Sequence, residues 1–239
     1  MPKLNDEWTV QPHGPLEMVA DGIWSVEGSI VMPLGRFPRR MTIIVLRTGD
    51  LAVWSPVPLE DRQMARLEAL GPVRFLIVPN AGHRLDIRAW KTRYPGALVL
   101  APPGASEAVA EAVSVDSTDN VLNDPTVTLE KVQGTKADEF AMLVSRDDGT
   151  TLILNDILAS VQHPHRLGAN IMARLFGFGV KRPRTSRLVR RIFVTEPGAV
   201  AQQFCKWAEI PDLQRIIVSH VDIIADSPAQ ALQRAAADF

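Results

Sequence analysis

The chain has 239 residues, of which 46% are hydrophobic and 22% charged, and its formal net charge is −1. These values are typical of a folded protein with a substantial core, and they exclude a strong overall bias toward nucleic acid or acidic substrates. The only cysteine is Cys205, which excludes an intramolecular disulfide and a thiolate zinc cluster. The N-terminus lacks a basic start followed by an apolar run, and no segment has about 20 uninterrupted apolar residues. We therefore expect a soluble, cytoplasmic protein with no transmembrane segment.

Short apolar runs rich in Val, Ile and Leu predict the strands. In chain order they span residues 42–46, 51–55, 73–78, 97–101, 127–133, 140–145, 151–155 and 215–219. The turn sequences Thr48–Asp50 and Asp147–Thr150 separate neighbouring runs and predict two hairpins.

Helices are predicted between some of these strands, because apolar residues recur there at helical spacing or good helix formers predominate. The ranges are 59–70, 86–94, 105–113, 196–210 and 229–239. Thr195 is expected to cap the fourth helix, and Ser227 before Pro228 to start the last one. Hairpins come first and strands then alternate with helices, an order that favours sheets covered by helices over a plain doubly wound fold.

A basic segment stands apart from these elements. No acidic residue occurs from Ile157 to Thr195. The basic residues of this stretch are Arg166, Arg174, Lys181, Arg182, Arg184, Arg187, Arg190 and Arg191. One interpretation is a solvated helical excursion at about 160–192 beside the core, and the other is a surface that contacts an anion, an anionic membrane or a partner. Aromatic residues are not interleaved with the basic ones, so there is no strong nucleic-acid signal.

Candidate metal ligands lie at or just after the ends of several predicted strands. They are His83, Asp156, the pair His163 and His165, and His220. A zinc or iron ion needs three or more ligands of the His, Asp, Glu or Cys type. If these loops share one sheet edge, His83, Asp156 and His220 are sufficient, with His163 or His165 added. An ion held there would acidify a water molecule for hydrolysis, with Asp156 as the catalytic residue.

Each candidate also has a purely structural interpretation. His83 could hydrogen-bond the backbone near Asn80, which itself is typical of a turn that orders the loop. Asp156 could cap the turn that follows it, and His220 could be a polar stop after an apolar strand. Cys205 is expected to be buried and inert. Packing or turn roles are expected for Trp54, Ser55 and Trp90.

The order of these elements and loops resembles the metallo-β-lactamase fold superfamily from about Asp21 to about Asp226. The resemblance rests on the segments LAVWSPVPL, EDRQMARLEAL, VRFLIVPNAGHRLDIRAW, YPGALVLAPPGA, GTTLILNDILAS and RIIVSHVDII. In that superfamily two sheets lie between helices, and one or two metal ions lie at the edge where the loops meet. The resemblance therefore implies an α/β (α+β) fold, a four-layer αββα sandwich, formed by residues 1–239 as a single domain.

The metal-binding motifs of the family are only partly present. Where the family has His-x-His-x-Asp-His, this chain has Asn80 in place of the first histidine and Gly82 near the second. The family's Gly-His-Thr turn corresponds to Gly134, Thr135 and Lys136. The resemblance thus implies that the first ion site is largely lost. The ligands that remain are of the second-site kind, namely His83, Asp156 and His220.

We therefore predict a metal-dependent, hydrolase-like protein with a reduced, at most mononuclear, site for zinc or another divalent ion. Asn80, Asp86 and Lys136 are the predicted substrate-binding residues, and the charge of Lys136 could hold an anionic group. The alternative, favoured by the lost motifs, is a non-catalytic protein of this fold that binds a ligand or partner without metal. A third is an adaptor that contacts a membrane or a partner through Arg166–Arg191.

Overall fold

The computed structural model describes residues 4–32, 35–159, 183–220 and 222–239, and their strands form two sheets. The first sheet contains β1 (Glu17–Ala20), β2 (Ile23–Met32), β3 (Gly35–Val45), β4 (Leu51–Trp54), β5 (Val73–Ile77) and β6 (Leu98–Leu100), in that order. The second contains β10 (Leu213–Val218), β9 (Gly149–Leu154), β8 (Phe140–Arg146) and β7 (Val127–Lys131), in that order. The predicted strands are therefore present.

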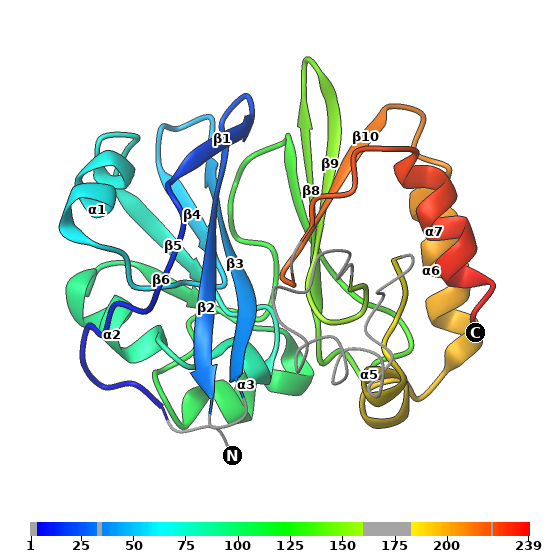
Figure 1. Cartoon of the computed structure of the whole chain (residues 1–239), viewed down its shortest axis with the longest axis horizontal. Coiled ribbons are helices and arrows are strands. Elements are labelled where there is room, and N and C mark those ends of the chain that lie inside the picture. Colours follow the sequence, from blue (N-terminus) through cyan, green and yellow to red (C-terminus); the bar gives the residue numbers. More distant parts are fainter. Residues whose placement is uncertain (1–3, 33–34, 160–182, 221) are drawn as a thin grey trace.

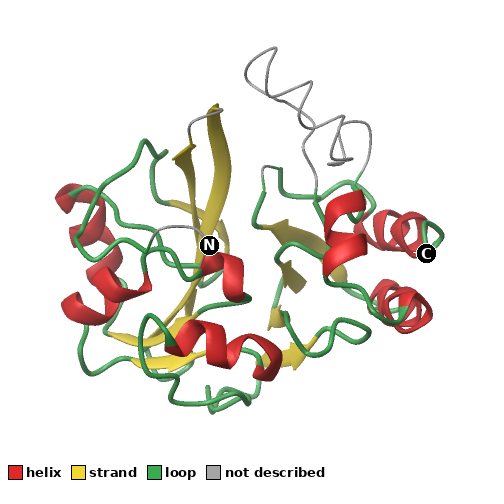
Figure 2. Cartoon of the chain, turned by 90° about the horizontal axis from the view of Figure 1, so that it is seen from below, coloured by secondary structure: helices red, strands yellow, loops and turns green. Residues whose placement is uncertain are grey.

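Helices cover the outer faces of both sheets. Their bounds are α1 Asp61–Glu68, α2 Ile87–Arg93, α3 Pro103–Ala110, α5 Arg187–Ile192, α6 Pro197–Ala208 and α7 Pro228–Ala236, with a 3-10 turn η1 at Ala81–His83. Figure 1 shows α1 and α2 outside the first sheet and α6 and α7 outside the second. Figure 2 shows the same flanking helices from below. This is the four-layer αββα arrangement that the resemblance implied.

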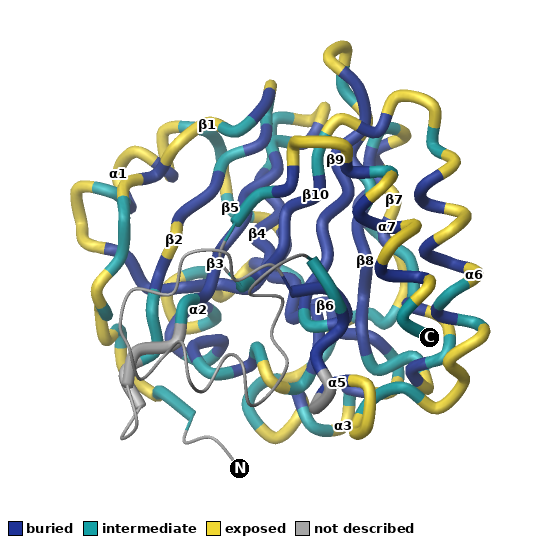
Figure 3. The backbone as a smooth tube through the Cα atoms, turned by 45° about the vertical axis from the view of Figure 1, so that its right-hand side comes forward, coloured by how far each residue is buried: buried dark blue, intermediate teal, exposed yellow. Residues whose placement is uncertain are grey.

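Three hydrophobic clusters correspond to the three contacts between these layers. Met64, Leu67 and Trp90 of α1 and α2 pack against the outer face of the first sheet. Another cluster fills the space between the sheets, and a third, which includes Phe204 and Leu232, joins α6 and α7 to the second sheet. Buried strands and the exposed outer sides of these helices are visible in Figure 3. Burial of apolar area is thus the force that fixes the layers.

Parallel strand pairs place several loops at one edge. β4, β5 and β6 are parallel neighbours, and so are β9 and β10. The carboxyl ends of parallel strands meet at the same side of a sheet, where ligands of α/β proteins commonly bind. Ser55, Asn80, Asp156 and His220 all follow such ends. A backbone hydrogen bond of 2.9 Å from Phe140 N to Pro79 O joins the two sheets at this edge.

Both predicted hairpins are present. β3 and β4 are joined through a turn in which Gly49 N donates to Leu46 O at 2.8 Å. In the β8–β9 hairpin, Gly149 has a φ of +112°, and a Cβ there would lie 2.5 Å from the Asp212 carbonyl oxygen. Glycine is therefore required at this turn.

Some expectations are wrong. Cys205 is exposed, because α6 turns it away from the second sheet. Glu196, not Thr195, is the N-cap of α6, and the Thr195 hydroxyl instead donates to Gly134 O at 3.2 Å. α7 starts at Pro228 as expected, but the Ser227 side chain makes no capping bond.

The basic segment is described only in part. Residues 160–182 lie outside the described part of the chain, which leaves His163, His165 and Arg166 without a position. At its end, the Arg190 guanidinium lies 5.1 Å from the ring centre of Phe239. Among the helices that are described, none is long and apolar enough to cross a membrane.

Candidate metal site

His83, Asp156 and His220 converge at the shared edge of the two sheets. One ligand atom from each lies within 4.8 Å of the others. His220 Nε2 is 2.8 Å and His83 Nε2 is 3.6 Å from the same atom, Asp156 Oδ1. Their side chains are 14%, 9% and 18% exposed, in the order His220, His83 and Asp156. The cluster is thus screened from bulk water but still reachable from outside.

The backbone of β3 fixes the orientation of His220. Its Nδ1 lies 2.7 Å from the carbonyl oxygen of Pro38. A carbonyl oxygen can only accept, so Nδ1 carries the proton and Nε2 is directed at Asp156. Metal-binding histidines usually donate their second ring N–H to such an acceptor, which sets the tautomer needed for coordination.

His83 is oriented in a similar way by Ser55. The Ser55 hydroxyl lies 2.7 Å from His83 Nδ1, and Ser55 has a left-handed φ of 53° directly after β4. Ser55, His83 and Asp156 form a chain of the serine-hydrolase type, but Ser55 is only 3% exposed. A hydroxyl buried to this extent orients His83 and is poorly placed to attack a substrate. Ser55 therefore has a role that the sequence, which indicated only packing or a turn, did not reveal.

Asn80 holds the other oxygen of Asp156. Its Nδ2 donates to Asp156 Oδ2 at 2.8 Å, while its Oδ1 accepts from Gly82 N at 2.9 Å. Asn80 therefore orders the loop, as expected, and also contacts the proposed ligand. Because Oδ2 accepts this bond, Asp156 directs Oδ1 alone at the two histidines.

Glu139 lies behind this cluster and is the buried acid that the sequence did not identify. It is 5% exposed and precedes β8. Its Oε1 accepts from Asn155 N at 3.2 Å and Ile157 N at 3.0 Å, and its Oε2 accepts from Asn80 Nδ2 at 3.3 Å. The Ser219 hydroxyl in turn bonds Asn155 Oδ1. Loops from both sheets are thus tied together around Asp156.

The electrostatics of the cluster favour a charged Asp156. Burial works to raise the pKa of Asp156, but the charges and hydrogen bonds of His83 and His220 hold it well below its usual range. Burial likewise works to lower the pKa of His220, and its bond to Asp156 raises the pKa overall. Burial dominates at His83 and lowers the pKa of its ring below the usual value, although the charge of Asp156 works to raise it.

The remaining predicted residues lie in different surroundings. The Asp86 carboxylate is fully buried in an ion pair with Arg39 and accepts from Asn5 Nδ2 at 2.7 Å. These bonds hold the N-terminal segment and β3 to the loop that carries His83. Lys136 is exposed and has a φ of 54°. Burial raises the pKa of Asp138, in the loop that leads to Glu139, and the positive charge of Lys136 opposes this shift.

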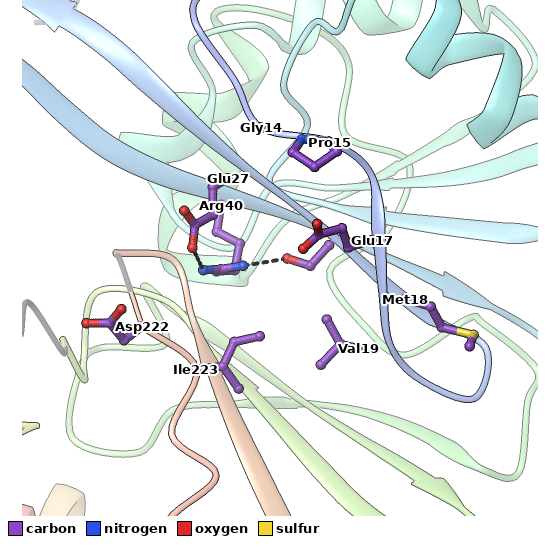
Figure 4. A pocket seen from close by; sticks show the side chains of 10 residues that line it. Gly14, Pro15, Glu17, Met18, Val19, Glu27, Arg40, Asp222 and Ile223 are labelled. Atoms are coloured by element: carbon purple, nitrogen blue, oxygen red, sulfur yellow. Dashed lines mark hydrogen bonds and ion pairs between the residues drawn. The ribbon is translucent and has the colours of Figure 1, made fainter. Parts of the chain in front are cut away.

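A cavity of about 390 Å³ lies beside the same loops. β3 lines it through Arg40, two residues after Pro38, and the loop after β10 lines it through Asp222 and Ile223. Figure 4 shows Arg40 bonded to Glu27 in its wall. The cavity is large enough for a small ligand, and His220 begins the loop that closes one side of it.

The donor set fits a divalent metal ion. Two imidazole nitrogens and one carboxylate oxygen make three protein ligands, the number in catalytic zinc sites that keep one position open. No second group of this kind occurs among the residues whose positions are described. The chemistry and number of these donors therefore suit one ion.

The architecture is that of a known fold. No model of a known protein family matches the sequence, and no curated protein matches it. Solved structures do match, and those compared are metallo-β-lactamases. The chain therefore has the fold of the metallo-β-lactamase superfamily.

Three of these structures illustrate the similarity. A metallo-β-lactamase from Erythrobacter litoralis is 13% identical, with a TM-score of 0.65 over 94% of this chain and 96% of that one. The metallo-β-lactamase DIM-1 is 12% identical, with a TM-score of 0.63 over 96% and 99%. FIM-1 from Pseudomonas aeruginosa, in its mono-zinc form, is 12% identical, with a TM-score of 0.59 over 97% and 98%.

Proposed function

We propose that this protein is a metal-dependent hydrolase-like protein with a single divalent ion, zinc for example, held by His83, Asp156 and His220. The observation that carries the proposal is the convergence of both Nε2 atoms on Asp156 Oδ1, at 2.8 and 3.6 Å. When bound, such an ion supplies Lewis acidity and lowers the pKa of water toward neutrality. Similarity to FIM-1 in a mono-zinc form agrees with one ion on this fold.

The chain's own residues would have separate roles in such a site. His220 and His83 present Nε2 because Pro38 and Ser55 engage their Nδ1 atoms. Asp156 supplies negative charge for the cation and is the proposed catalytic residue. A substrate would approach from the partly exposed side of the cluster.

A second candidate function is ligand binding without metal or catalysis on the same fold. The Asn80 side chain favours it, because an amide stands where the family has its first histidine and already bonds Asp156. In that case the cluster would be a structural ion pair between Asp156 and His220, and the cavity would be the binding site.

Metal analysis of protein purified without chelator separates the two. We expect about one ion per chain in the wild type and none in Asp156→Asn or His220→Gln, with circular dichroism unchanged. His13→Gln is the matched control, because the His13 ring bonds Gly14 O and Glu60 N and should leave the ion in place. Wild-type protein that takes up no zinc, cobalt or manganese would exclude the metal-dependent function and leave the second candidate.

A further inference from the structure

Glu139 contacts both chain neighbours of Asp156. Its Oε1 accepts the backbone N–H groups of Asn155 and Ile157, at 3.2 and 3.0 Å. These two bonds clamp the backbone on either side of Asp156 and so limit how its side chain can be aimed. Glu139 is itself held in place, because the next residue, Phe140, donates its N–H to Pro79 O at 2.9 Å.

A second path runs from Glu139 to Asp156 through a side chain. The Asn80 amide donates to Glu139 Oε2 at 3.3 Å and to Asp156 Oδ2 at 2.8 Å, so one NH2 group bridges the two carboxyl groups. Asn80 cannot turn its amide over, because its Oδ1 accepts from Gly82 N. Asp156 Oδ2 is thereby held away from the histidines, and Oδ1 toward them.

We propose that Glu139 is a positioning residue for the cluster, which aims Asp156 Oδ1 at His83 and His220 through Asn80 and through the backbone at 155 and 157. The proposal rests on the proposed metal site and extends it to a residue that would not touch the ion. Partners of this kind typically change metal affinity by about 10–100-fold when they are removed.

Two replacements of Glu139 should lower zinc affinity to different extents. In Glu139→Gln one oxygen can still accept both backbone N–H groups, but the new NH2 faces the NH2 of Asn80, so only the side-chain path is broken. Glu139→Ala breaks both paths. We expect zinc affinity, measured by competition with a chromogenic chelator, to fall about 10-fold in the first and about 100-fold in the second.

Asp124 provides a matched control, because it is also a buried acid whose carboxylate holds a loop through backbone N–H groups. It is 7% exposed and its carboxylate accepts the backbone N–H groups of Arg47 and Thr126, at 2.7 and 2.8 Å. Asp124→Asn should lower stability and leave zinc affinity unchanged. If Glu139→Gln and Glu139→Ala also keep wild-type affinity, or lose no more than Asp124→Asn, the positioning role is excluded.

A metal-free measurement keeps this test separate from the proposed function. In chelator-treated protein we expect both Glu139 variants to shift the side-chain ¹⁵N resonances of His83 and His220, because Asp156 Oδ1 moves relative to their Nε2 atoms. Asp124→Asn should leave these resonances unchanged. Absence of zinc binding in the wild type, together with shifted resonances, would refute the metal site but support the positioning role. Unshifted resonances in folded Glu139 variants would overturn the positioning role in either case.

Discussion

Replacing Glu139 by glutamine should change how the stability of the metal-free protein depends on pH. Burial, together with the negative charge of Asp156, raises the pKa of Glu139 from 4.5 to about 8. Because the native value lies above the unfolded one, the native protein binds this proton more tightly. The resulting stabilisation is complete below pH 4.5 and is lost as the pH rises to about 8.

The size of the effect follows from the difference between the native and the unfolded pKa of Glu139. A glutamine cannot ionise, so the free energy of unfolding of the wild type should fall relative to Glu139→Gln by up to roughly 1.4 kcal/mol per pH unit. From about pH 5 to about pH 8 the difference should change by on the order of 4 kcal/mol. Urea unfolding at intervals of one pH unit, in the presence of a chelator, measures this difference.

Asp124→Asn is again the control for the pH experiment. Burial works to raise the pKa of Asp124, but hydrogen bonds from Arg47 and Thr126 lower it overall. The stabilisation that Asp124 provides is therefore present at pH values above the ordinary pKa of an aspartate and is lost only in acid. The wild type and this variant should differ by a constant amount from about pH 5 to about pH 8. A difference between the wild type and Glu139→Gln that is equally constant would show that Glu139 is ionised throughout, which would refute the reasoning.

Three further outcomes can be checked separately. Ser55→Ala removes the partner of His83 Nδ1 and should weaken zinc binding about 10-fold in chelator competition. Ser106→Ala, which removes a hydroxyl bond to Pro103 O within α3, should not. Asn5→Ala leaves the buried Asp86 carboxylate with one bond fewer and should lower the free energy of unfolding by about 1–2 kcal/mol in urea, and no loss would mean that this bond does not contribute to stability. Cys205 is exposed and should react with a thiol reagent in native protein at the same rate as in Asp124→Asn, whereas protection until unfolding would contradict its position on α6.

Much of the fold follows from local sequence patterns. Apolar runs of strand length became buried strands, such as β9, all of whose residues are buried. β1, β2 and the first half of β3 were not predicted. The turn between β1 and β2 contains Asp21 and Gly22, a recognisable signal, whereas Pro38 lies within β3 although proline is disfavoured inside a sheet. Pro38 is tolerated because it pairs only with Ser29 of β2, and β4 begins to pair with β3 further along, at Thr42.

The sequence singled out the three candidate ligands that the structure brings together, but not the residues that support them. His83, Asp156 and His220 could be found because each follows an apolar strand whose end was expected at one edge. Glu139 could not, because it lies among charged residues in a stretch typical of an exposed turn. Its burial depends on the pairing of Phe140 with Lys131 and on the bond of Phe140 to Pro79, which join parts of the chain far apart in sequence.

The carbonyl of Pro38 has a consequence for the charge at the centre of the cluster. Since it takes the Nδ1 proton of His220, a neutral His220 would direct a lone pair at a carboxylate oxygen 2.8 Å away, and the two would repel. Something positive must therefore stand between them, either a second proton on the ring or a cation. The two exclude each other, so uptake of an ion should expel one proton from His220, and acid should displace the ion.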